Sequence, residues 1–421
     1  MFKVQESRQL QWSVSIGGSK NAALPLLAAA LLIKWKIHLT NVPDILDIHD
    51  FIHFYESLWA EVSFKNHELF LDTANLDVSG MDTSKIARTR AWIYFIAWLL
   101  HRFWNASIPF PSWDKIWKRP IDEHINGYKD MWYTFFERDD MLHFEGPWFD
   151  TDVTITAYFA VTATANLIMW WVGRKWITTI ELAAFEPHIF NLVDMLRQAG
   201  VVIDIRYDHT IIIHWGTTLA SEISQEIIPD YLQSGTFIIL WALASEKYID
   251  IHRARISDLA SFLYKIHETG VKTQDMWNDT LRVYRAHKLK AVNIQTNIFP
   301  WFPTDLMPLF SVLMTQCEWT SRIHEILYEG RLNWLVEYER LWASPRIINL
   351  HEAKITWPTA LVWNTVNSWD LRSWAAMVLA GLISSWETKI DNIYWINRGY
   401  DDFIWKLKQL WANIEELTTN T

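Results

Sequence analysis

The chain has 421 residues, of which half are hydrophobic and a fifth are charged. This composition excludes a mainly disordered protein and supplies enough apolar side chains for two or more domains with cores of their own. The net charge of -10 disfavours a nucleic-acid partner bound through a general basic surface, but it permits a local basic pocket for a small anion.

The sequence shows neither a membrane span nor an export signal. No uninterrupted apolar run reaches the roughly eighteen residues of a membrane helix, and the opening MFKVQESRQLQW lacks the basic-then-apolar order of a secretory signal. We therefore expect a soluble, cytoplasmic protein. Cys317 is the single cysteine, so a disulfide framework and a cysteine-based metal site are excluded. We expect it to be a small core residue, with a reactive thiol as the less favoured alternative.

An internal repeat of about seventy residues runs through the chain. At six places a helix-like stretch ends at one residue and a strand-like stretch follows; these residues are Trp59, Trp132, Gly200, Gly270, Trp342 and Trp411. A turn that precedes a strand recurs with the same period, at Trp35, Trp104, Trp176, Glu246, Trp319 and Trp386. Such periodicity indicates stacked supersecondary units. We predict an α/β or α+β protein of two lobes with three units each, divided near residue 229.

Four of the six predicted helix ends carry tryptophan where glycine is expected. Helices commonly end in the left-handed conformation, which favours glycine because it has no Cβ, and a bulky residue there is an outlier. The chain has 28 tryptophans and 13 glycines, whereas average usage would give roughly 29 glycines. We hypothesise that UGA codons, which specify glycine in some bacterial lineages, have been translated here as tryptophan.

Two alternatives to recoding would also account for the tryptophans. The protein could stack sugars or bases on its indoles, or the sequence could be damaged or artificial. Stacking platforms should cluster on one face. These tryptophans instead recur at turns in every unit, which favours the codon hypothesis.

In chain order, the first functional candidate is the stretch GGSKNAALPLLAAALL, which predicts a long apolar helix beginning at Lys20 and Asn21. The free N–H groups and positive dipole end of a helix start suit a phosphate or carboxylate. The spacing is not that of a P-loop. Taken alone, a lysine at this place is more often solvated than a ligand.

The second unit contains an inserted loop. Its stretch from turn to helix end is 28 residues long, against 23 to 25 in the other five. The extra residues fall in SIPFPSWDKIWKRPID, between Ser107 and Asp122. Loops inserted on a regular scaffold often carry function; a harmless surface extension is the alternative.

Four motif regions give the sequence a specific resemblance. GGSKNAALPLLAAALL, RPIDEHINGY, FPTDLMPLF, and DLRSWAAMVLAG with INRGYDDF span almost the whole chain. In order and spacing they resemble the UDP-N-acetylglucosamine 1-carboxyvinyltransferase family of enolpyruvyl transferases. The resemblance implies a two-lobed, inside-out α/β barrel of six βαβαββ repeats. We expect residues 20–228 to form the first lobe, with the catalytic loop, and residues 1–19 together with 229–421 to form the second.

The resemblance also implies a reaction. The enolpyruvyl group of phosphoenolpyruvate would move to the 3-hydroxyl of UDP-N-acetylglucosamine with release of phosphate, in the first committed step of peptidoglycan synthesis. Both substrates are small molecules. No metal, organic cofactor, nucleic acid, membrane or obligatory protein partner is expected.

Catalytic roles are carried over by motif position. Lys20, Arg119 and Arg398 would hold phosphoenolpyruvate, with Arg90 and Arg372 adding positive charge, because a phosphate and carboxylate substrate suits charge-assisted contacts. A surface salt bridge is the alternative for any one arginine. Asp305 would be the general base, or the N-cap of the helix that follows it, or both.

The remaining site residues belong to the nucleotide sugar and its surroundings. Arg331 and Asp370 would support closure and the active-site network. Residues around Ala163 would complete the uridine pocket. The expected UDP-sugar contacts are Asn21, Arg90, Arg119, Pro120, Ile121, Asp122, His124, Thr304, Asp305 and Leu327.

The chain departs from the family pattern in its loop. Many members have Gly-Gly-Cys-x-Ile-Gly there, with the cysteine as general acid and as target of the epoxide antibiotic fosfomycin. Here the cysteine position is Asp114, between Trp113 and Lys115. A carboxyl group can donate a proton if an apolar site raises its pKa, but it cannot be alkylated as a thiolate is. Tyr158 and Tyr231 stand where relatives often have basic residues.

Two further functions remain as alternatives. The enolpyruvyl transferases that act on shikimate 3-phosphate have Lys-Ser where this chain has Lys20-Asn21. A catalytically inactive repeat protein that binds or scaffolds is the third possibility. Phosphate release with each candidate acceptor would separate them.

Overall fold

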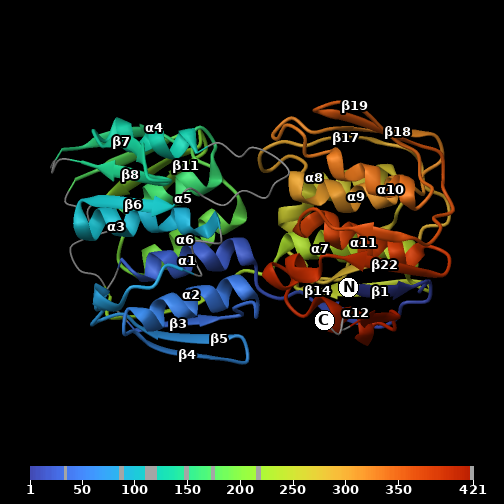
Figure 1. The fold of residues 1–421 in the computed structure, drawn as a ribbon, viewed down its shortest axis with the longest axis horizontal. Helices are drawn as coiled ribbons and strands as arrows, with labels where there is room; N and C mark the ends of the chain where they lie inside the picture. The colour runs from blue at the N-terminus through green and yellow to red at the C-terminus, as the bar shows by residue number, and fades with distance from the viewer. Residues whose placement is uncertain are drawn as a thin grey trace. The chain divides into compact units, whose positions relative to one another are not determined.

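The computed structural model describes residues 1–32, 36–84, 90–109, 121–146, 151–171, 176–214 and 220–417. These residues form two compact units (Figure 1). The first unit comprises the described residues from Gly18 to Ile228. The second unit comprises Met1–Gly17 and the described chain from Pro229 onward. Each unit has its own hydrophobic core.

The first unit alternates strands and helices. Its elements are α1 (Lys20–Ala30), β3 (Lys36–Thr40), α2 (Leu46–Ser57), β4 (Glu61–Lys65), β5 (Glu68–Asp72), η1 (Val78–Gly80), η3 (Arg90–Tyr94), α3 (Phe95–Phe103), β6 (Asn105–Pro109), α4 (Asp122–Asp130), β7 (Thr134–Arg138), β8 (Met141–Glu145), β9 (Val153–Thr156), α5 (Val161–Trp170), β10 (Thr178–Glu181), α6 (Pro187–Gln198), β11 (Val202–Arg206), β12 (Thr210–His214) and β13 (Glu222–Glu226).

The second unit follows the same plan. Its elements are β1 (Phe2–Gln5), β2 (Ser13–Ser15), α7 (Tyr231–Ala244), β14 (Tyr248–His252), η4 (Ile256–Leu259), α8 (Ala260–Glu268), β15 (Thr273–Asp275), β16 (Leu281–Tyr284), β17 (Asn293–Gln295), η5 (Thr304–Leu306), α9 (Met307–Met314), β18 (Thr320–His324), η6 (Asn333–Val336), α10 (Glu337–Arg340), β19 (Pro345–Asn349), β20 (Glu352–Thr356), β21 (Thr365–Asn367), α11 (Leu371–Ile383), β22 (Glu387–Asp391), η7 (Ile393–Arg398), α12 (Phe403–Gln409) and β23 (Ile414–Glu416).

Among the described residues, five of the six sheets share one pattern, a parallel pair followed by two antiparallel neighbours. In the third repeat β9 pairs in parallel with β10, and the sheet continues through β12 to β11. The chain order β9, α5, β10, α6, β11, β12 is the predicted βαβαββ unit. The mixed α/β class and the six-fold repeat are therefore confirmed.

Strands distant in sequence complete three of the sheets. In the first unit, β13 pairs in parallel with β3, so the last strand of that unit completes its first sheet. In the second unit, β2 pairs in parallel with β14, and β1 lies between β22 and β23. A parallel neighbour needs a long connection. Here the N-terminal residues supply two strands to the second unit, β2 as a parallel neighbour and β1 as an antiparallel one.

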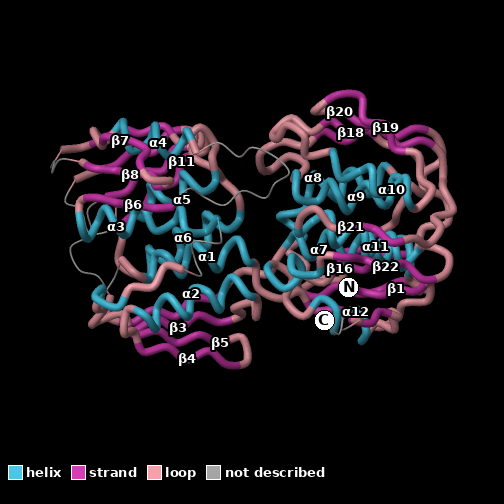
Figure 2. The backbone as a smooth tube through the Cα atoms, in the orientation of Figure 1, coloured by secondary structure: helices cyan, strands magenta, loops and turns pink. Residues whose placement is uncertain are grey.

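Helices occupy the interior of each unit, between its sheets (Figure 2). In the second unit α7, α9 and α11 are buried along nearly their whole length, and they pack on one another. A helix that is apolar all round belongs in a core, which explains runs such as MPLFSVLM. Within the described residues, every helix is too short or too polar to cross a membrane.

The four tryptophans at predicted helix ends are all left-handed. Trp59, Trp132, Trp342 and Trp411 have φ between 60° and 70°, and Gly200 and Gly270 have φ of 95° and 92°. Six more tryptophans of the described part have positive φ; they are Trp12, Trp104, Trp277, Trp319, Trp357 and Trp386. The left-handed helix ends expected from the repeat are confirmed. Backbone geometry at these turns is that of glycine.

Trp342→Gly should stabilise the protein. The indole of Trp342 is 72% exposed, so little packing is lost, and a left-handed non-glycine residue costs about 1 kcal/mol. We expect the free energy of unfolding in urea to rise by about that amount. The matched control is Trp405→Gly, which removes another exposed indole from α12 and should destabilise by about 1 kcal/mol. Equal destabilisation by both substitutions would contradict the strain argument.

Candidate active site

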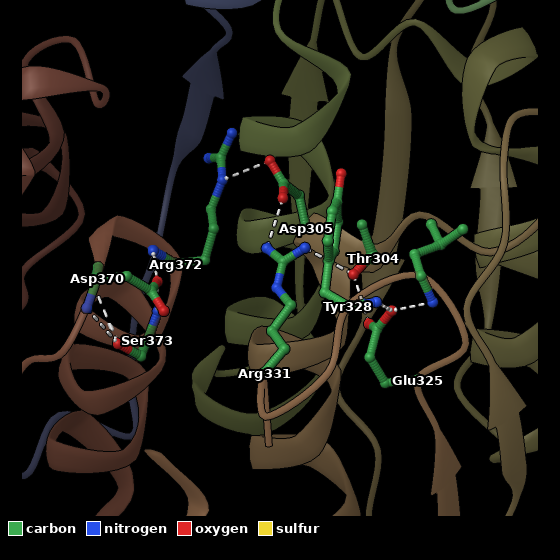
Figure 3. A network of polar contacts seen from close by, with 9 residues as sticks. Thr304, Asp305, Glu325, Tyr328, Arg331, Asp370, Arg372 and Ser373 are labelled. Carbon is green, nitrogen blue, oxygen red and sulfur yellow. Dashed lines mark hydrogen bonds and ion pairs between the residues drawn. The ribbon is translucent and has the colours of Figure 1, made fainter. Parts of the chain in front are cut away.

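The second unit holds an aspartate between two arginines (Figure 3). Asp305 lies in η5, immediately before α9. Its Oδ1 accepts a hydrogen bond of 2.6 Å from Arg331 Nη2, and its Oδ2 accepts one of 3.2 Å from Arg372 Nε. The side chain of Asp305 is 30% exposed, whereas those of Arg331 and Arg372 are 2% and 7% exposed. An accessible carboxylate is thus oriented by two buried cations.

The alternative of Asp305 as an N-cap is wrong. The N-cap of η5 is Pro303 and that of α9 is Leu306, and neither makes a side-chain cap. The carboxylate is engaged by guanidinium groups, which form stronger, charge-assisted bonds. The Asp305 carboxylate therefore binds Arg331 and Arg372 and does not cap the helix.

Thr304 joins the same network. Arg331 Nη1 donates a hydrogen bond of 2.6 Å to Thr304 Oγ1, and this hydroxyl donates one of 2.5 Å to Glu325 Oε2. Glu325 is fully buried. Its other oxygen accepts from the backbone N–H of Leu327 at 2.9 Å. One carboxylate therefore contacts the segments of two predicted UDP-sugar residues, Thr304 and Leu327.

Asp370 positions Arg372 at the start of α11. Its Oδ1 accepts from the backbone N–H groups of Arg372 and Ser373 at 2.7 and 2.8 Å, in a capping box with Ser373. Burial raises the pKa of Asp370, and the positive charge of Arg331 opposes that rise. Both network residues predicted from sequence, Arg331 and Asp370, thus lie around Asp305.

Arg372 has unused donor capacity. Its guanidinium lies 5.2 Å from the ring centre of Tyr400. Among the described residues, its buried Nη1 makes no hydrogen bond. Since buried donors are normally satisfied, this N–H suits the acceptor oxygen of an anionic ligand. Arg398, at the end of η7, is half-buried and lies 5.9 Å from the ring centre of Tyr394.

In the first unit, Lys20 begins α1 as predicted, after the N-cap Ser19. Its Nζ lies 2.5 Å from Oδ2 of Asp47, and the two side chains are 17% and 2% exposed. The alternative of a solvated lysine is therefore not what the structure shows. Asn21 follows in the same turn and is half-buried. At this helix start the ammonium group of Lys20 is therefore held by the buried carboxylate of Asp47.

His124 is buried in α4 and faces α5. Its Nε2 lies 2.8 Å from Thr162 Oγ1, and its Nδ1 lies 3.4 Å from Asn166 Nδ2. Thr162 precedes Ala163, so the structure brings together two stretches predicted for the uridine pocket. At the start of α4, Ile121 is buried and Asp122 is exposed.

Several predicted residues lie outside the described part. They are Asp114, Arg119 and Pro120, together with Trp113 and Trp117 of the loop, and the side chain of Arg90, whose backbone begins η3.

Comparison with known proteins identifies the family. Residues 4–407 match the family described as EPSP synthase (3-phosphoshikimate 1-carboxyvinyltransferase). UDP-N-acetylglucosamine 1-carboxyvinyltransferase 2 of Listeria monocytogenes is 30% identical over 411 residues, which cover 98% of this chain and 96% of that protein. UDP-N-acetylglucosamine 1-carboxyvinyltransferase of Psychromonas ingrahamii is 32% identical over 424 residues, 99% of each chain.

The chain belongs to the enolpyruvyl transferase family. It is a carboxyvinyltransferase, and the resemblance seen in the motifs is confirmed. The crystal structure of the enolpyruvyl transferase NikO from Streptomyces tendae matches with a TM-score of 0.88 at 21% identity, covering 98% of both chains. EPSP synthase from Acinetobacter baumannii matches with a TM-score of 0.70 at 11% identity, covering 99% of both chains. The enolpyruvyl transferase fold, a two-lobed inside-out α/β barrel, is therefore shown.

Three further residues singled out from the sequence are Tyr158, Tyr231 and Cys317. Tyr158 is exposed and left-handed, with φ of 49°, whereas Tyr231 is buried at the start of α7. Cys317 is fully buried and donates to the carbonyl oxygen of Leu313. Burial raises the pKa of the Cys317 thiol to about 12, so it stays protonated at neutral pH. The expectation of a core cysteine is confirmed.

Sequence reasoning missed two carboxylates of this enolpyruvyl transferase. Asp47 lies in the first turn of α2 and Glu325 directly follows β18. An acidic residue at the edge of an apolar run was the available signal, because a buried carboxylate requires a partner. Only the folded chain identifies those partners as Lys20 and Thr304.

Proposed function

We propose that the chain transfers the enolpyruvyl group of phosphoenolpyruvate to the 3-hydroxyl of UDP-N-acetylglucosamine and releases phosphate. The observation that carries the proposal is the Asp305 carboxylate, accessible and held by two buried guanidiniums. A base fixed in this way can take the hydroxyl proton if the sugar lies within hydrogen-bond reach. Relatives named for this reaction match the full chain and support the acceptor.

Each remaining residue has a proposed part in the reaction. Lys20, Arg119 and Arg398 hold phosphoenolpyruvate, and Arg90 and Arg372 stabilise its negative charge. Asp305 takes the proton of the sugar hydroxyl, whose oxygen then bonds to the enolpyruvyl carbon. Asp114, as general acid, protonates the methylene carbon of phosphoenolpyruvate as the new C–O bond forms, which gives a tetrahedral intermediate. A proton then returns from that methyl group to the site, the bond to the phosphate oxygen breaks, the carbon–carbon double bond re-forms, and phosphate leaves.

The proposal extends to substrate binding and cellular role. The UDP-sugar is bound by Asn21, Arg90, Arg119, Pro120, Ile121, Asp122, His124, Thr304, Asp305 and Leu327. Arg331 and Asp370 orient the general base. Residues 20–228 act as the lobe with the catalytic loop, and residues 1–19 with 229–421 act as the lobe with Asp305. The reaction would occur in the cytoplasm and serve peptidoglycan synthesis, and thereby cell shape and division.

Phosphate release should depend on the acceptor. The purified protein with phosphoenolpyruvate should release phosphate when UDP-N-acetylglucosamine is added, and not with shikimate 3-phosphate. Asp305→Asn should lower kcat at least about 100-fold, since it removes the general base. The matched control is Asp250→Asn, which breaks another aspartate–arginine pair, with Arg282, and should leave turnover unchanged. The proposal would be overturned if phosphate is released with shikimate 3-phosphate but not with UDP-N-acetylglucosamine, or if neither acceptor gives phosphate release.

We also infer that most turn tryptophans occupy glycine positions of the natural protein. Ten tryptophans with positive φ support this, because glycine adopts that conformation without strain. Nine of the ten indoles are exposed, so replacing them removes little core. Glycines at Trp113 and Trp117 would free the catalytic loop of two bulky side chains.

The gene sequence tests this inference directly. Codons for Trp59, Trp132, Trp342 and Trp411 should read UGA. UGG at these four positions would refute the recoding hypothesis. The phosphate-release assay should then be run on both forms, and the glycine form should have the higher kcat.

Fosfomycin should not inactivate the enzyme. Asp114 offers no thiolate to the epoxide, and the only thiol, Cys317, is buried with its pKa raised to about 12. We expect full activity after incubation with fosfomycin and no mass increase. Asp114→Cys is the positive control and should become inactivated, with the adduct at position 114. Inactivation of the unmodified chain with an adduct on Asp114 would contradict the prediction.

A further inference from the structure

We infer that Glu325 is a positioning residue for the general base, acting on Asp305 through Thr304 and Arg331. The inference rests on the proposed role of Asp305. The link from Glu325 to Asp305 runs through three hydrogen bonds. Glu325 sets the direction of the hydrogen bonds that hold the base (Figure 3).

Glu325 is held rigidly in a buried position. Its Oε1 accepts from the backbone N–H groups of Leu327 and Tyr328, at 2.9 and 3.3 Å, and its Oε2 accepts from Thr304. Its own backbone N–H donates to the carbonyl oxygen of His351 at 2.8 Å, and its carbonyl oxygen lies 2.7 Å from His351 Nδ1. Burying a carboxylate costs several kcal/mol unless it is well paired. Three donors hold this fully buried carboxylate in one orientation beside Thr304.

The charge of Glu325 determines which way the Thr304 hydroxyl points. A carboxylate can only accept, so Thr304 must donate its single hydrogen to Glu325. The hydroxyl oxygen is then free to accept from Arg331 Nη1. This bond fixes the rotation of the guanidinium, and its second nitrogen, Nη2, meets Asp305 Oδ1 at 2.6 Å.

Glutamine has the same shape as glutamate and cannot satisfy the same partners. If its oxygen accepts from Thr304, its NH₂ group faces the N–H groups of Leu327 and Tyr328, donor against donor. If its oxygen accepts from those N–H groups, its NH₂ group donates to Thr304, and the hydroxyl hydrogen must turn elsewhere, toward Arg331 among others. Either arrangement loosens the support of Arg331, and buried mismatches of this kind are costly.

Glu325 also balances the charge of Arg331. Burial opposes the charged form of Arg331, and the carboxylates of Asp305, Glu325 and Asp370 together raise its pKa. A negative charge near an acid raises the pKa of that acid. Removing the charge of Glu325 alters this balance at Arg331 and at the base that Arg331 holds, so the acid limb of the kcat profile should move.

The test compares Glu325→Gln with a matched control in the same unit. Glu337 is also buried; it accepts from Trp369 Nε1 and the backbone N–H of Asn367, both at 3.1 Å. Glu337→Gln thus reproduces the structural cost of neutralising a buried carboxylate. We expect Glu325→Gln to lower kcat about 10- to 100-fold, as a small misplacement of a catalytic group does. The KM for phosphoenolpyruvate should change less than about threefold, whereas Glu337→Gln should leave kcat and the pH profile unchanged.

A second variant guards against misfolding of the first. Thr304→Val removes the hydroxyl between Glu325 and Arg331, and its effect on kcat should not add to that of Glu325→Gln. Additive effects, unchanged kcat in Glu325→Gln, or equal losses in Glu325→Gln and Glu337→Gln with an unmoved pH profile would overturn the inference. The proposed function fails separately, if the unmodified enzyme releases no phosphate with UDP-N-acetylglucosamine or if Asp305→Asn keeps full activity.

Discussion

The contact of the Asp305 carboxylate with Arg331 and Arg372 is the interaction on which the site depends. Two buried guanidiniums would be unstable without carboxylate partners, because each loses its hydration. Their charges are balanced by Asp305, Glu325, Asp370 and Asp230. Of these four carboxylates, that of Asp305 is partly exposed and the other three are buried. The arrangement therefore leaves the Asp305 carboxylate as the accessible one of the four.

The repeat explains how these groups come together. Asp230 caps α7, Asp305 precedes α9, and Asp370 caps α11. These three buried helices start the three repeats of the second unit and pack on one another. Each repeat thus places an aspartate near the start of its first helix, and Arg372 interacts electrostatically with Asp230 and Asp305. Burial raises the pKa of Asp230 and Asp370, and the arginines limit that rise.

The left-handed tryptophans are a local feature that the global fold tolerates. Their φ values match those that glycine adopts at helix ends, yet nine of the ten indoles are exposed. The strain is therefore spread over many separate turns and leaves the two cores intact. Buried indoles are different: those of Trp241, Trp334 and Trp374 fill the core of the second unit. Position in the fold thus separates tryptophans that strain the backbone from tryptophans that pack.

Sequence alone determined the repeat, the α/β class, the helix start at Lys20 and the left-handed helix ends, because period and turn chemistry are local properties. The motif at Asp305 was also visible, although its role as an N-cap was not borne out. Only the tertiary structure decided that Asp47 holds Lys20, that Glu325 holds Thr304, and that β13, β2 and β1 complete distant sheets. These contacts join residues far apart in the chain, and hydrophobic periodicity carries no information about which buried carboxylate meets which cation.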